Sequence, residues 1–91
     1  MTTESEAAFL ADVGMRVRLL RTVRRMSQDR LADVAGVSRV TLGEIERGEH
    51  GAGVLRYRAV AAALDVPLGS LFDGNPDPDT LVDTAGPQSP P

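Results

Sequence analysis

The stretch from Ser27 to Gly48, SQDRLADVAGVSRVTLGEIERG, constrains the fold more than any other part of the chain. Gly36 interrupts an otherwise helical pattern and stands four residues after the small residue Ala32. Glycine accepts the positive φ that a sharp reversal of the chain requires, which costs a residue with a Cβ atom most. A small residue lets two helices cross closely. The stretch therefore predicts two short helices joined by a tight turn.

The apolar residues of this stretch recur at spacings that turn one face of each predicted helix inward. They are Leu31, Val37, Leu42 and Ile45. With Ala32 and Gly36, they form the expected core of a helix-turn-helix, a motif that can place its second helix in the major groove of DNA.

Serines mark where these two helices start. Ser27 precedes a helix expected over residues 28–35, and Ser38 precedes one expected over 39–47. A serine at such a position caps a helix because its hydroxyl accepts a hydrogen bond from a free backbone N–H. Gly48 then ends the second helix in the usual manner of a C′ glycine.

Three further helices complete an all-α pattern. An apolar stripe predicts a first helix from Ala7 to about Arg25. The stripe consists of Phe9, Val13, Val17 and Leu20. A second stripe predicts a fourth helix. Its members are Val54, Tyr57, Val60, Ala61 and Leu64. Pro67 suits the first turn of a fifth helix that ends near Phe72.

The chain of 91 residues has room for one small domain. We expect residues 1–12 to be a partly helical N-terminal extension and residues 13–73 to be the helix-turn-helix domain. Residues 74–91 are rich in Pro, Asp, Gly, Ser and Thr, and they predict a disordered tail.

Composition excludes several kinds of site. The chain has no cysteine, so it cannot form a disulfide, a thiol nucleophile or a thiolate metal site. The lone His50 cannot build a metal site by itself. No apolar run approaches the roughly 20 residues that span a bilayer, and the acidic N-terminus differs from a signal peptide. We therefore expect a cytoplasmic protein that binds no metal or cofactor and is not an enzyme.

Charge is distributed unevenly along the chain. The net charge is −3, whereas nucleic-acid-binding domains are usually basic. All ten positive side chains are arginines between Arg16 and Arg58, and that span holds only five acids, which gives it a net charge of +5. The basic middle between acidic flanks is compatible with a DNA partner, although some of these arginines are expected to be solvated helix surface.

From Val13 to Phe72 the chain resembles the lambda-repressor-like helix-turn-helix family, in its Cro/xenobiotic-response-element branch. The resemblance rests on RVRLLR, on MSQDRLADVAGVSRVTLGEIERG and on ALDVPLGSLF. It implies a five-helix domain that binds operator DNA, usually as a homodimer on an inverted repeat, and that regulates transcription.

The resemblance also implies which residues contact DNA. Base edges would face Arg39, Val40, Thr41 and Glu44. Arg39 is suited to guanine O6 and N7, Val40 to a thymine methyl and Glu44 to cytosine N4. Phosphates would be held by Gln28, Ser38, Arg47 and the amide of Gly48.

Each of these assignments has a simpler alternative. Ser38 can act as a helix cap only, Arg39 can be solvated, and Val40 can simply be tolerated at the surface. Glu44 is an acid where relatives often carry a base or an amide, and phosphates repel a carboxylate. The family pattern further implies a partly buried structural ion pair between Arg21 and Glu46.

Dimerisation and partners leave further alternatives open. One helix-turn-helix reads only a few base pairs, so two copies improve specificity. The candidate dimer surface consists of Leu55, Val66, Leu68, Leu71 and Phe72, which can instead close the core of one subunit. A second interpretation is an antitoxin or another protein-interaction module whose partner binds the last helix or the acidic tail. A restriction–modification controller is a variant of the regulator.

Overall fold

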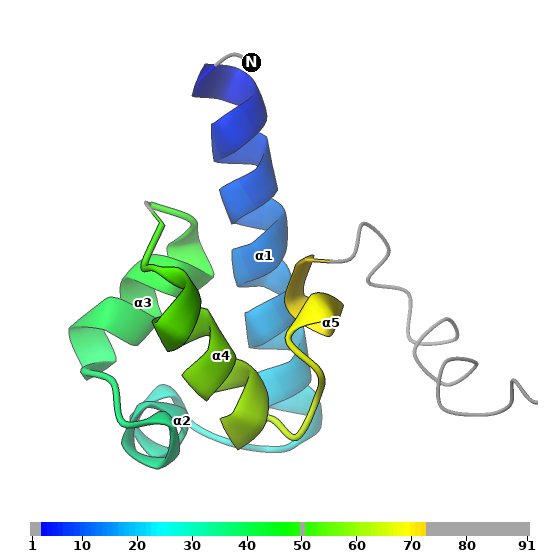
Figure 1. Ribbon diagram of the computed structural model, residues 1–91. Helices are drawn as coiled ribbons and strands as arrows, with labels where there is room; N and C mark the ends of the chain where they lie inside the picture. The colour runs from blue at the N-terminus through cyan, green and yellow to red at the C-terminus, as the bar shows by residue number, and fades with distance from the viewer. Residues whose placement is uncertain (1–2, 50, 73–91) are drawn as a thin grey trace, which may run out of the picture.

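A computed structural model of the chain describes residues 3–49 and 51–72, and these residues form five α-helices and no strand (Figure 1). The helices are α1 (Thr3–Val23), α2 (Gln28–Ala35), α3 (Arg39–Arg47), α4 (Val54–Ala63) and α5 (Gly69–Phe72). The expected all-α fold is confirmed. The predicted disordered tail, 74–91, and His50 lie outside the described residues.

Helix α1 differs from its predicted bounds at both ends. It begins at Thr3 rather than at Ala7, and it crosses the expected domain boundary at residue 12 without a break. It ends at Val23 because Arg25 adopts a left-handed conformation with φ of 58°. The amide of Arg25 donates to the carbonyl of Thr22 at 2.9 Å, and that of Met26 donates to the carbonyl of Arg21 at 3.0 Å. Glycine usually occupies such a position, so the sequence carried no signal for this stop.

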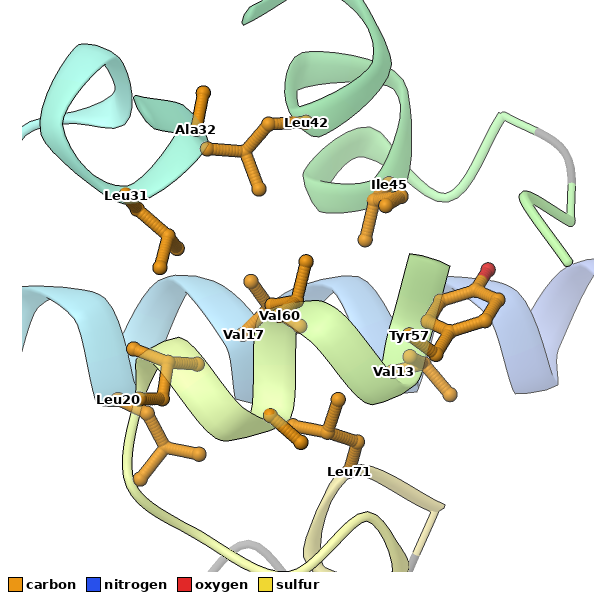
Figure 2. Packing of buried hydrophobic residues seen from close by; sticks show 12 residues of the cluster. Val13, Val17, Leu20, Leu31, Ala32, Leu42, Ile45, Tyr57, Val60 and Leu71 are labelled. Atoms are coloured by element: carbon orange, nitrogen blue, oxygen red, sulfur yellow. The ribbon is translucent and has the colours of Figure 1, made fainter. Parts of the chain in front are cut away.

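The core lies where all five helices meet (Figure 2). α1 packs against α3 and α5, while α2 packs against α3 and α4. The buried apolar side chains are Val13, Val17, Leu20, Leu31, Ala32, Leu42, Ile45, Tyr57, Val60, Ala61, Leu64 and Leu71. The predicted apolar stripes thus enter the core, except for their first members. Phe9 remains about half exposed beside the ring of Phe72, and Val54 is exposed at the start of α4.

Glycine allows α1 and α3 to approach closely. A Cβ atom on the buried Gly14 would collide with the backbone carbonyl oxygens of Ile45 and Glu46. A Cβ atom on Gly48 would lie 2.8 Å from the Cα of Ala11 in α1. These two contacts place the C-terminal end of α3 directly against α1.

Helix α5 is shorter than expected, because it begins at Gly69 and leaves Pro67 in the preceding turn. The carbonyl of Pro67 accepts a hydrogen bond from the amide of Ser70 at 2.9 Å. The buried guanidinium of Arg16 holds this end of the chain, because its Nη1 donates to the carbonyl of Leu71 at 2.9 Å. Within the described residues, no helix is both long and apolar enough to cross a membrane.

The five candidate dimer residues have unequal environments. Leu71 is fully buried, and Val66, Leu68 and Phe72 are partly buried against the core. Leu55 is different, because 71% of it is exposed at the start of α4.

Candidate nucleic-acid interface

Helices α2 and α3 are joined by a three-residue turn, Gly36, Val37 and Ser38. Gly36 takes the left-handed conformation, with φ of 75° and ψ of 28°. The amides of Gly36 and Val37 both donate to the carbonyl of Ala32, at 2.9 and 3.0 Å. These bonds close the C-terminus of α2 and redirect the chain, so that α3 starts directly after Ser38.

Serine side chains cap both helices. The hydroxyl of Ser27 accepts a hydrogen bond from the amide of Arg30 at 3.0 Å, and that of Ser38 accepts one from the amide of Thr41 at 2.9 Å. The hydroxyl of Ser38 also donates to Oγ1 of Thr41 at 2.9 Å. This bond orients both hydroxyl groups at the start of α3. Both residues are predicted to contact DNA.

Helix α3 has one buried face and one exposed face. Leu42, Gly43 and Ile45 are buried, and they fix the helix to the core (Figure 2). Arg39 and Val40 are exposed, and Val40 exposes 69% of its surface. The four predicted base-reading residues therefore lie in the first six positions of α3, with Thr41 and Glu44 half-buried between the two faces.

Arg39 has a partner that the sequence did not indicate. Its Nε lies 3.1 Å from Oδ1 of Asp29, which belongs to the first turn of α2. This ion pair joins the exposed starts of the two helices.

Arg47 has an acidic partner at the other end of α3. Its Nε donates to Oε2 of Glu49 at 2.6 Å, and its Nη2 donates to Oε1 at 3.3 Å. The hydrogen bond and the charge of Glu49 raise the pKa of Arg47, and the charge of Glu44 adds to this. A phosphate would compete with Glu49 for this guanidinium.

Arg21 and Glu46 form an ion pair inside the molecule. Nε of Arg21 donates to Oε2 of Glu46 at 2.7 Å, and Nη2 donates to Oε1 at 3.1 Å. Only 15% of the Arg21 side chain and 4% of the Glu46 side chain are exposed. The Nη1 of Arg21 also donates to the carbonyl of Met26 at 2.8 Å, which ties the loop before α2 to the pair.

Gln28 and Gly48, the other two predicted phosphate contacts, also have hydrogen bonds within the protein. Nε2 of Gln28 donates to Oε1 of Glu46 at 3.0 Å, which fixes the side chain at the start of α2. The amide of Gly48 donates to the carbonyl of Ile45 at 3.0 Å and caps α3. If the amide of Gly48 also bound a phosphate, its one N–H group would be shared between the phosphate and the carbonyl of Ile45.

The sequence interpretation missed Gly14, Arg16 and Asp29. Gly14 adjoins the apolar stripe of α1, and a glycine inside a helical pattern is a signal of close packing. Arg16 lies beside the same stripe, but its burial gives no signal in the sequence. In the part of the chain that the structure describes, no group of His, Cys, Asp or Glu residues is arranged to hold a metal ion.

Known proteins share this arrangement. The helix-turn-helix family matches residues 17–71 of the chain. An uncharacterised HTH-type transcriptional regulator of Sinorhizobium medicae is 33% identical over 64 residues, which are 70% of this chain and 46% of that protein. The immunity repressor protein of Bacillus phage phi105 is 34% identical over 59 residues, 65% of this chain and 41% of that protein. The chain thus spans less than half the length of these two relatives.

Two solved structures are similar to most of the helical unit. The restriction-modification controller protein C.AhdI from Aeromonas hydrophila is 37% identical, with a TM-score of 0.69, and the match covers 71% of this chain and 98% of that chain. A transcriptional regulator from Vibrio cholerae is 28% identical, with a TM-score of 0.71, over 87% of this chain and 43% of that chain. The resemblance in the sequence is confirmed, and the chain belongs to the lambda-repressor-like helix-turn-helix family.

Proposed function

We propose that this chain is a sequence-specific double-stranded DNA-binding protein that regulates transcription. The observation that carries the proposal is the two-sided α3, which is anchored by buried Leu42 and Ile45 and exposes Arg39 and Val40 at its start. In helix-turn-helix proteins this part of the second helix lies in the major groove. The names of the relatives, an immunity repressor and a restriction-modification controller, favour a repressor or autoregulator.

In this proposal α3 reads base edges. Arg39 donates to guanine O6 and N7, Val40 packs on a thymine methyl, and Glu44 accepts from cytosine N4. Thr41 contacts a base or a phosphate. The hydrogen bond between Ser38 and Thr41 supports this assignment, because it fixes both hydroxyls at the exposed start of α3.

Phosphates are bound at the ends of the helices. Gln28 and Ser38 stand at the starts of α2 and α3, where backbone N–H groups also attract anions. Arg47 and the amide of Gly48 hold a phosphate at the far end of α3. Because Glu49 already binds Arg47, the binding of phosphate there requires exchange of one anion for another.

A second copy of the chain completes the DNA-binding unit. We assign it to the apolar surface of Val54 and Leu55 at the start of α4, since these residues are 60% and 71% exposed. The chain would then bind an inverted repeat as a homodimer. In this proposal it acts in the cytoplasm and is not an enzyme. The same apolar surface favours, as the second candidate, a module that binds a different protein, as an antitoxin does.

Selection from a random pool of duplex DNA tests the proposal. The full chain should enrich an inverted repeat, and fluorescence anisotropy should show tighter binding to that duplex than to a scrambled one. Arg39→Ala should reduce this preference by about 1–3 kcal/mol. Arg58→Ala, which removes an exposed arginine of α4, is the control and should preserve the preference.

Salt provides a second readout, because phosphate contacts release counterions and affinity should fall steeply as salt rises. Binding that is sensitive to salt but equally strong for every sequence would contradict the proposal. Co-purification of a protein partner with no selected duplex would favour the second candidate.

A further inference from the structure

The ion pair between Arg39 and Asp29 joins the two helices of the helix-turn-helix at their exposed ends. Arg39 is the first residue of α3, and Asp29 is the second residue of α2. Nε of Arg39 lies 3.1 Å from Oδ1 of Asp29. Their side chains are 65% and 75% exposed, so both face the solvent from which DNA would approach.

Asp29 contacts only one edge of the Arg39 guanidinium, so another edge can bind DNA. A guanidinium is a planar fork with five N–H donors, and it binds a partner through two parallel hydrogen bonds. The carboxylate lies at the Nε edge, whereas the end that carries Nη1 and Nη2 has the same forked geometry. That end matches the O6 and N7 acceptors of guanine.

A free arginine loses considerable side-chain freedom when it binds in one geometry. A carboxylate that already holds the Nε edge reduces this loss. The same carboxylate repels the phosphates of any DNA, whatever its sequence. Asp29 would therefore weaken sequence-independent binding and strengthen the choice of base.

We infer that Asp29 is a positioning residue that sets the preference of Arg39 for guanine. The inference rests on the proposed function, because it requires Arg39 to read a base. Asp29 also lies in the first turn of α2, where a negative charge stabilises a helix. That structural role would alter stability, but it would not alter which base pair the protein prefers.

A comparison of the wild-type chain with five variants tests the inference. The variants are Asp29→Asn, Asp29→Glu, Asp33→Asn, Arg39→Ala and the double variant Asp29→Asn/Arg39→Ala. Asp33 is an exposed acid of the same helix, so its substitution removes an equal charge from α2. Each protein is titrated with the duplex selected from the random pool and with duplexes that carry one changed base pair. The Arg39 base pair is the one at which Arg39→Ala loses its preference.

Asp29→Asn should lower the preference for guanine at the Arg39 base pair by about two- to fivefold, the range expected from the loss of one exposed ion pair. Its binding to scrambled duplex should become equal or tighter. Asp33→Asn should leave the preference unchanged. Asp29→Glu keeps the charge on a longer side chain and should retain part of the preference. In a background of Arg39→Ala, Asp29→Asn should no longer alter the choice of base.

Three results would overturn the inference. The first is an unchanged preference in Asp29→Asn together with a lost preference in Arg39→Ala, which leaves the proposed function intact. The second is a loss at another base pair, which would mean that Asp29 contacts DNA itself. The third is an Arg39→Ala protein that keeps every base preference, which would refute both the inference and the assignment of Arg39 to a base.

Discussion

Glu46 joins three helices through one carboxylate. It belongs to α3, accepts two hydrogen bonds from Arg21 of α1, and accepts a third from Gln28 of α2. Because its side chain is almost fully buried, these bonds replace the water that the charge would otherwise hold. A single buried charge thus links α2 and α3, the two helices proposed to contact DNA, to α1.

Removing one partner of the pair between Arg21 and Glu46 should destabilise the protein far more than replacing both partners with apolar residues. Arg21→Met leaves Glu46 buried without its cation and should lower the free energy of unfolding by about 3–5 kcal/mol. The double variant Arg21→Met/Glu46→Leu should recover much of that loss, because no unpaired charge remains. Urea denaturation at equilibrium measures both effects, and Arg18→Met, an exposed arginine of α1, is the control. Additive losses in the double variant would rule out the coupling.

The contact between α1 and α3 depends on the absence of a side chain at Gly14. Backbone oxygens of Ile45 and Glu46 occupy the space that a Cβ atom would need. Carbonyl groups of a helix cannot move aside independently, so a larger residue would push the two helices apart. Gly43 of α3 is different, because the atoms nearest to its Cβ atom would be those of the Arg47 guanidinium, with Nη1 at 3.0 Å, at the end of a flexible side chain.

Two alanine substitutions should therefore have opposite effects. Helix propensity alone favours alanine over glycine at both positions by about 1 kcal/mol. Gly43→Ala should realise this gain in part and raise the free energy of unfolding by about 0.5–1 kcal/mol. Gly14→Ala should lower it by about 1–3 kcal/mol, since overpacking outweighs propensity. Thermal unfolding followed by circular dichroism distinguishes them, and a stabilised Gly14→Ala would refute the close packing of α1 on α3.

Among the described residues, Val54 and Leu55 are neighbouring apolar residues that lie exposed at the start of α4. If a second copy covers them, Leu55→Ser should shift the chain from dimer toward monomer in sedimentation at micromolar concentration. Val23→Ser removes an apolar residue of similar exposure at the end of α1 and should leave the dimer intact. A monomeric wild type at these concentrations would exclude this interface.

The sequence predicted the helices whose ends are marked by capping residues close to them in the chain. Both helices of the motif have the expected bounds, because a serine cap and a left-handed glycine act within a few residues of each helix end. The C-terminus of α1 and the start of α5 were missed, because Arg25 stops α1 without a glycine and Pro67 stands outside α5. The end of α5 at Phe72 is as predicted. The pair of Asp29 and Arg39 could not be foreseen either, since it depends on how α2 and α3 are placed in space.

The separation of α3 into two faces has a consequence for descent after gene duplication. Residues that hold the helix in place and residues that would choose an operator are different residues, so selection can alter the second set while the fold persists. Two duplicated copies can then come to bind different operators on one chromosome. A shared Asp29 would not limit that divergence once Arg39 is replaced, since its proposed effect on the choice of base acts through Arg39.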